Sequence, residues 1–149
     1  KTVHKAVYSE EKLRLMNKSD GICKVCKEER ETLIHLICKC KVASDVWKEI
    51  SSILSDITNL DYTFNNKNVI LGFSRDYVEN VSHRLFYNFV TLITKWQIWK
   101  HRNNVKYDAS QKLSTYHLTR NAILSCKKTL KSFSSQIESW KCQMLVFLF

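Results

Sequence analysis

Five side chains of the types that bind soft metal ions lie within 18 residues and restrict the local fold more than any other feature of the sequence. Cys23 and Cys26 form a C-x2-C pair, and His35 and Cys40 follow with a spacing of five. Two thiolates three residues apart fit adjacent corners of a tetrahedron from one tight turn. The second pair fits the other two corners from about one helical turn. Because Zn²⁺ accepts this mixture of sulfur and nitrogen, and four ligands leave no open position, we predict one structural zinc ion per chain.

The other cysteines leave alternatives open. Cys38 lies three residues after His35 and could close the tetrahedron in place of Cys40. The cysteines of the cluster could also be unrelated thiols that are buried without binding a metal. Cys126 falls on an apolar helix face, so we expect it to be a small core residue. Cys142 has no evident role. The sequence shows no secretory leader, so we expect a reducing, intracellular location, nuclear and cytoplasmic, rather than three disulfides.

The chain has only two glycines and no proline, which argues against an all-β sandwich because such folds need frequent turns. Apolar residues recur at spacings of three and four over 42–57, over 78–103 and from 111 to the end, which predicts amphipathic helices. A shorter helix is expected over 1–19. We therefore expect a mostly α fold, in which a small Cys3His zinc knuckle is followed by a helical bundle with two long helices.

Three parts are predicted along the chain. Residues 1–58 hold the N-terminal helix, the knuckle and the next amphipathic helix; 59–77 are a loop or connector; 78–149 form a basic helical hairpin. Within the connector, the apolar run Val69–Phe73 is too short to assign. The chain starts with Lys1 rather than Met, as expected for a piece of a longer reading frame. No apolar run approaches the ~20 residues of a membrane span, so we expect no membrane partner.

The long helix over 78–103 is expected to bury one face and to expose the opposite one. The expected buried face is apolar and consists of Leu85, Phe89, Leu92, Trp96 and Trp99, widened by Phe86, Val90 and Ile93. The opposite, polar stripe consists of Arg84, Asn88, Thr91, Lys95 and Arg102. An exposed tryptophan could stack on a nucleic-acid base, but the spacing of Trp96 and Trp99 favours the core.

The segment from 111 to the end has a heptad-like pattern of apolar residues. One series consists of Tyr116, Ile123, Leu130, Ile137 and Met144, and the second, three residues further on, of Cys126, Phe133, Trp140 and Phe147. This seam could pack against the face Leu85–Trp99 or against another chain. The last run, Met144–Phe149, is apolar on all sides, so we expect it either to pack under the helix over 46–57 or to cause self-association.

The net charge of +10 comes from 24 Lys and Arg against 14 Asp and Glu. It is concentrated after residue 80, where only Asp108 and Glu138 are acidic. Such a segment is typical of nucleic-acid binding, although a solvated helix surface would show the same balance. The candidate phosphate-binding residues are Arg84, Lys95, Lys100, Arg102, Arg120, Lys127, Lys128 and Lys131.

The zinc motif resembles the C-terminal zinc-binding region of LINE-type (non-LTR) retrotransposon reverse transcriptases. The resemblance rests on the C-x2-C pair, Glu31-Thr32-Leu33, His35-Leu36, Cys40 and Trp47. It continues in Val69-Ile70-Leu71-Gly72 and in Ile98-Trp99-Lys100-His101-Arg102-Asn103, which is similar to an Ile-Trp-Lys-x-Arg-Asn pattern of that family. In the family the last cysteine lies five residues after the histidine, which implies Cys23, Cys26, His35 and Cys40 as the zinc ligands.

The sequence departs from the family at three positions next to the cysteines. The family often has Pro after the first and last cysteines, where this sequence has Lys24 and Lys41. It often has Gly after the second cysteine, where this sequence has Lys27 and where the backbone often adopts a positive φ.

The resemblance implies that the chain helps to hold element RNA or target DNA during retrotransposition. Its partners would be RNA or DNA and the upstream reverse-transcriptase domains of the same polyprotein. The sequence has no paired-aspartate polymerase signature and no acidic cluster for Mg²⁺, so we expect no catalysis by this chain. The alternative is a zinc-stapled helical module for protein–protein interaction without nucleic-acid binding.

Overall fold

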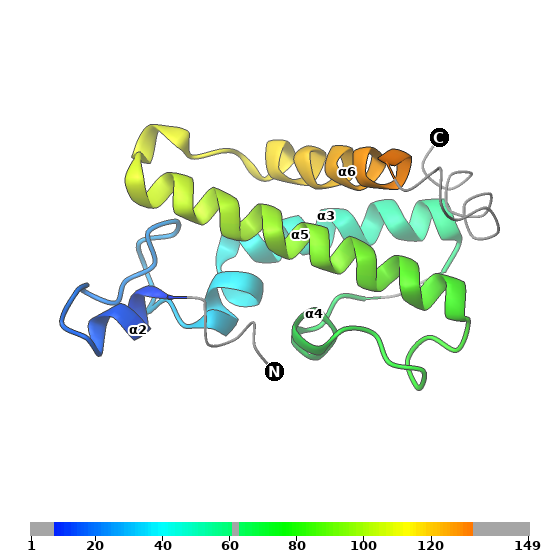
Figure 1. Cartoon of the computed structure of the whole chain (residues 1–149), viewed down its shortest axis with the longest axis horizontal. Coiled ribbons are helices and arrows are strands. Elements are labelled where there is room, and N and C mark those ends of the chain that lie inside the picture. Colours follow the sequence, from blue (N-terminus) through cyan, green and yellow to red (C-terminus); the bar gives the residue numbers. More distant parts are fainter. Residues whose placement is uncertain (1–7, 61–62, 133–149) are drawn as a thin grey trace.

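The computed structural model describes residues 8–60 and 63–132, and this part of the chain is mostly helical (Figure 1). Its elements are α2 (Glu10–Arg14), the π-helical turn η1 (His35–Lys39), α3 (Lys41–Thr58), α4 (Asn66–Leu71), α5 (Val81–Tyr107), the 3-10 turn η2 (Ala109–Gln111) and α6 (Thr115–Ser132). The described ranges contain no β-strand, and one isolated bridge pairs Ile22 with Arg30. The expected fold class is confirmed, because a Cys3His cluster precedes a set of helices.

The helix α2 is much shorter than the one expected over 1–19. Ser9 begins it, since its hydroxyl accepts a hydrogen bond from the backbone N–H of Lys12 at 3.3 Å. Asn17 ends the following turn with a left-handed φ of 56°, and the Lys18 N–H returns to the Leu13 carbonyl. This is the backbone pattern of a helix stop. Residues 1–7 lie outside the described part of the chain.

The helices α3, α5 and α6 form the bundle. The chain turns at η2, and α6 runs back along α5 and also packs on α3 (Figure 1). Apolar side chains of all three helices belong to one buried cluster, which includes Ile50 of α3, Ile98 of α5 and Cys126 of α6. The helices expected over 42–57 and 78–103 correspond to α3 and α5. No helix among the described residues is both long and apolar enough to cross a membrane.

The buried face of α5 differs from the expected one. Leu85, Leu92 and Trp96 are 54, 62 and 58% exposed. The buried positions are instead Phe86, Tyr87, Val90, Thr91, Thr94, Ile98, His101, Arg102 and Val105. Some polar members of this set have partners inside the protein, as when the Thr91 hydroxyl donates to the Tyr87 carbonyl at 2.7 Å, whereas the side chains of Thr94 and His101 have no hydrogen-bond partner among the described residues. Of the expected face, Phe86 and Val90 are buried and Phe89, Ile93 and Trp99 pack against the core, so the hydrophobic pattern is wrong only for Leu85, Leu92 and Trp96.

The buried stripe of α6 also differs from the expected seam. Cys126 and Leu130 are buried as expected, and Ile123 packs against the core, but Tyr116 is 64% exposed. The remaining buried positions are Leu118, Thr119 and Ala122, because α6 packs on both α3 and α5 and the buried arc shifts toward them. The other seam residues, Phe133, Ile137, Trp140, Met144 and Phe147, and the run Met144–Phe149 lie outside the described residues.

The connector between the two halves contains α4, so the run Val69–Phe73 is partly helical. Gly72 ends α4 with φ 87°, and a Cβ there would lie 2.7 Å from the Asn88 side-chain oxygen. The same Asn88 amide accepts from the Phe73 N–H at 2.6 Å and donates to the Phe73 carbonyl at 3.1 Å. Phe73 in turn packs edge-on against Phe64. These contacts hold the connector to α5.

Candidate metal centre

Two short backbone turns bring the four expected ligands together. Around the C-x2-C pair, the Lys27 N–H donates to the Cys23 carbonyl at 2.8 Å and the Cys23 N–H donates to the Glu29 carbonyl at 2.9 Å, which closes a tight turn. The second pair spans η1, where the Cys40 N–H donates to the His35 carbonyl. A bond from residue i+5 to residue i defines a π-helical turn, and it places two side chains five residues apart near each other.

The geometry of the cluster fits a four-coordinate metal ion. The ligand atoms of Cys23, Cys26, His35 and Cys40 all lie within 4.8 Å of one another. The Cys23 and Cys40 sulfurs are 4.0 Å apart, and the Cys26 sulfur is 3.4 Å from the His35 Nε2. A tetrahedral zinc site has ligand–ligand distances of about 3.5–3.8 Å, given its metal–ligand bond lengths. These residues could therefore hold a metal ion with only small shifts.

Glu29 orients the histidine of this cluster. Its Oε2 lies 3.1 Å from the His35 Nδ1, while the His35 Nε2 faces the thiols. A carboxylate on Nδ1 fixes the tautomer with the proton on that nitrogen, which leaves the Nε2 lone pair for a metal ion. Glu29 was not among the residues expected at the site. Its position six residues before the histidine is the only signal for it, and that spacing is not specific.

Hydrogen bonding between two of the thiols separates their acidities. The contact with Cys23 lowers the pKa of Cys40, whereas the same contact, together with burial, raises the pKa of Cys23. The pair thus favours one thiol and one thiolate. A metal ion that binds the three sulfurs as thiolates displaces the protons that they carry, so metal binding to this cluster is expected to strengthen as the pH rises.

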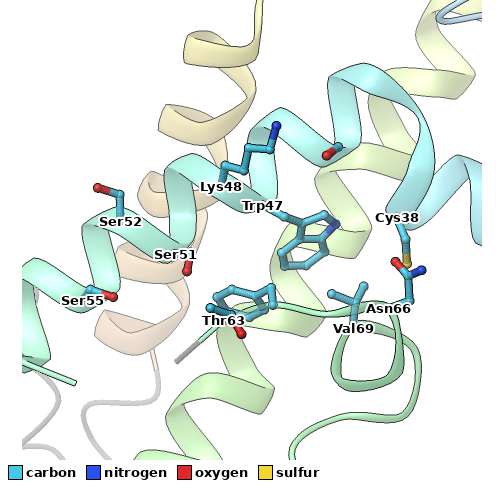
Figure 2. A pocket seen from close by; sticks show the side chains of 11 residues that line it. Cys38, Trp47, Lys48, Ser51, Ser52, Ser55, Thr63, Asn66 and Val69 are labelled. Carbon is cyan, nitrogen blue, oxygen red and sulfur yellow. The ribbon is translucent and has the colours of Figure 1, made fainter. Parts of the chain in front are cut away.

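Cys40 rather than Cys38 belongs to the cluster. Cys38 is buried, and its sulfur lines a cavity between α3 and α4 (Figure 2). Burial raises the pKa of Cys38 to about 11. The geometry thus agrees with the ligand set that the resemblance implies.

The cavity beside Cys38 has a volume of about 440 Å³ and is separate from the cysteine cluster. Aromatic rings of Trp47 and Phe64 lie along it, with ring centroids 5.1 Å apart. Figure 2 shows hydroxyl side chains of α3 along the same groove, and Lys48 is its charged lining residue. The indole N–H of Trp47 is already donated to the Ile37 carbonyl at 2.7 Å.

The eight candidate phosphate-binding residues have different environments. Lys100, Arg120, Lys128 and Lys131 are exposed. Arg84 and Lys95 are half-buried: the Arg84 guanidinium donates to the Val78 carbonyl at 2.9 Å, and burial lowers the pKa of Lys95. Lys127 is also half-buried. The expected polar stripe of α5 is therefore wrong as a solvated surface, because most of it faces the protein.

Arg102 is the clearest correction among these candidates. Its residue exposure is 2%, and its Nη2 lies 2.6 Å from both Glu10 Oε1 and Glu31 Oε1. Lys106 Nζ also lies 2.7 Å from Glu10 Oε1. Arg102 therefore connects α5 to the segment 23–40, which carries the candidate metal ligands, and is not available to a phosphate. Two segments that carry the resemblance, one with Glu31 and one with Arg102, are in contact here.

Comparison with known proteins does not assign the chain to a family. No family model, curated protein or solved structure was found to match it. The fold and the site together define a class, namely a mostly helical protein with a candidate Cys3His metal centre. The resemblance to LINE-type reverse transcriptases stays a prediction.

Proposed function

We propose that this chain is a nucleic-acid-binding module similar to the C-terminal region of a LINE-type reverse transcriptase. It would hold element RNA or target DNA through α5 and α6 while upstream domains of the same polyprotein carry out the chemistry. The observation that carries the proposal is the charge of these two helices. Neither α5 nor the described α6 contains an aspartate or glutamate, and Lys100, Arg120, Lys128 and Lys131 are exposed on them.

Two of these lysines lie on one face of the helix pair. The Gln97 amide donates to the Ser125 hydroxyl at 2.8 Å and so joins α5 to α6 near the surface. Lys100 and Lys128 each follow one of these residues by three positions, which places each about one turn from the hydrogen bond. Because the helices run in opposite directions, the two lysines are about 9 Å apart along the helix axes. A nucleic-acid backbone could contact both.

The metal centre would act as a structural support in this proposal. Cys23, Cys26, His35 and Cys40 would hold Zn²⁺, whose contribution is to cross-link a segment with little regular structure. Glu29 would keep the imidazole oriented. The buried contacts of Arg102 with Glu10 and Glu31 would hold the cross-linked segment in a fixed position on α5.

The salt dependence of binding tests the proposal. Affinity for RNA and for duplex DNA should fall steeply as salt increases, since bound phosphates release counterions. The double variant Lys100→Ala with Lys128→Ala should weaken both and reduce the slope of log affinity against log salt by about two units. Lys67→Ala, an exposed lysine on α4, is the matched control and should change neither. If the double variant has the same affinity and the same salt slope as the wild type, the two lysines only solvate the helix surface and do not bind nucleic acid.

The alternative function, a metal-stapled module for protein–protein interaction, is favoured by a different observation. Val81, Leu85 and Leu92 are all more than half exposed on the first half of α5. Exposed apolar residues on one helix face are typical of a docking surface. Concentration-dependent association in sedimentation experiments without nucleic acid, abolished by Leu85→Ala with Leu92→Ala, would support this alternative.

A further inference from the structure

The exposed face of α5 is apolar in the first half of the helix and carries aromatic and basic side chains in the second half. Its first half presents the apolar side chains Val81, Leu85 and Leu92. Its second half presents Trp96, Lys100 and Tyr107, of which Trp96 is 58% and Tyr107 84% exposed. These three residues are spaced by four and seven positions, so they lie on one side of the helix. They span about 16 Å at the rise of an α-helix.

The two neighbouring tryptophans of α5 have different environments. Trp99 is half-buried against the core, and the Arg102 guanidinium lies over its ring at 5.3 Å from the centroid. Trp96, three positions earlier, is 58% exposed, and within the described part of the chain no other ring or cation packs on its indole. A large apolar ring at this exposure is costly in water, and it is free to accept a flat partner.

We infer that Trp96 is a stacking platform for the bases of single-stranded nucleic acid, with Lys100 contacting the adjacent phosphate. The inference rests on the proposed function and names the form of nucleic acid that the surface selects. A base can stack on an indole only if its own face is free, which is so in a single strand and not inside a duplex. The charge of α5, which has basic residues and no carboxylate, favours an anionic occupant.

The arrangement matches the general chemistry of single-strand binding. Such surfaces combine cations that follow the backbone with aromatic rings that accept successive bases, and they discriminate little between sequences. The distance from Trp96 to Tyr107 corresponds to about five stacked nucleotides at 3.4 Å each. Exposed basic residues of α6, such as Arg120 and Lys128, would extend the phosphate contacts beyond α5.

The experiment compares single-stranded and duplex probes on the full, zinc-loaded chain. Fluorescence anisotropy measures the affinity for a labelled oligouridine, an oligothymidine and a duplex of equal length at one salt concentration, and then over a salt series. Trp96→Ala should weaken binding of both single strands by about 5- to 150-fold, the range for loss of one stacked base. It should leave duplex affinity within about twofold and the salt slope unchanged, because no charge is removed.

Two matched variants keep the test specific. Trp96→Phe retains an aromatic face and should preserve most of the single-strand affinity. Leu92→Ala removes an apolar side chain of similar exposure one turn earlier and should have no effect. Circular dichroism and thermal unfolding should show that all three variants fold as the wild type does, since both side chains are more than half exposed.

The outcomes separate this inference from the function on which it rests. Unchanged single-strand affinity in Trp96→Ala, with steep salt-dependent binding intact, overturns the stacking platform alone. Failure of the wild type to bind any probe overturns both. Equal losses in Trp96→Ala and Leu92→Ala, or equal losses for single strands and duplex, also contradict stacking. Loss of self-association in Trp96→Ala, with unchanged binding of every probe, would identify the face as a protein-docking surface instead.

Discussion

Arg102 and Glu31 form a buried ion pair between residues 71 positions apart in the sequence. The Arg102 Nη2 lies 2.6 Å and its Nε 3.0 Å from the Glu31 Oε1. The same carboxylate accepts the backbone N–H of Glu10 at 2.9 Å, and Glu10 contacts both Arg102 and Lys106. Two carboxylates and two cations thus balance here, with Glu10, Glu31 and Arg102 buried and Lys106 partly exposed. The segment 23–40, α2 and α5 meet at this point.

Removal of Arg102 should therefore destabilise the whole protein. Arg102→Ala leaves Glu31 buried without its cation, which is expected to lower the free energy of unfolding by about 3–5 kcal/mol. Arg102→Lys should recover only part of this loss, because an ammonium cannot reproduce the contacts of the planar guanidinium with two carboxylates. Urea denaturation monitored by circular dichroism measures both. Lys100→Ala, an exposed position on the same helix, is the control, with an expected change within about 0.5 kcal/mol. A loss no larger than that of the control would contradict the ion pair.

Zinc content should depend on the four clustered ligands and not on the neighbouring thiol. Elemental analysis of the reduced protein should give near one zinc per chain, and Cys26→Ser and Cys40→Ser should each lose it. Cys38→Ser should retain it, because that sulfur lines the cavity between α3 and α4. Metal loss in Cys38→Ser together with metal retention in Cys40→Ser would show that the ligand set is wrong.

Chelation should also weaken the bundle. The spacing of the apolar residues alone predicts helices after residue 78 that pack without the knuckle. The structure instead places Cys23, Val25 and Leu36 in the same buried cluster as Val46 and Ile98. Chelator addition should therefore lower the thermal midpoint measured on the helical signal, and not only disorder the segment around the cysteines. An unchanged midpoint in zinc-free protein would mean that the two parts are energetically independent.

Lys27 holds the position at which the resembling family often has glycine. Its φ is 63°, in the left-handed region where a side chain is strained. Lys27→Gly should relieve this strain and stabilise the zinc-loaded protein by about 0.5–1 kcal/mol, less than the full strain because glycine also gains entropy on unfolding. Glu28→Gly is the matched control, since Glu28 is also exposed and has no positive φ, and it should destabilise the protein. Thermal unfolding of the two variants side by side gives the sign, and a destabilised Lys27→Gly would refute the argument.

Local features of the structure could be predicted from the sequence, whereas long-range ones could not. The grouping of the four candidate metal ligands and the helix α3 follow from spacings within one or two turns, and both were expected. The buried face of α5 depends on partners elsewhere in the chain, such as Glu31 for Arg102. Hydrophobic periodicity carries no information on such a pair, so it assigned Arg102 to the solvent and Trp96 to the core. Because Arg102 is buried, the basic surface is smaller than expected. Because Trp96 is exposed, that surface carries an aromatic ring.

Stability should decrease in mildly acidic solution because of a buried histidine. His101 is 4% exposed, neither ring nitrogen has a hydrogen-bond partner in the described part of the chain, and burial together with the charge of Lys112 lowers its pKa below 6.5. The unfolded chain therefore binds a proton near pH 6.5 that the folded protein does not, so stability is full above this pH and declines below it. The slope reaches at most about 1.4 kcal/mol per pH unit from one group. His101→Leu replaces the imidazole with an apolar side chain of similar size that cannot bind a proton. It should reduce the loss of unfolding free energy between pH 6.5 and 5, as measured by urea denaturation. The exposed His117→Leu is the control, and a decline that persists equally in both variants would assign it to groups other than His101.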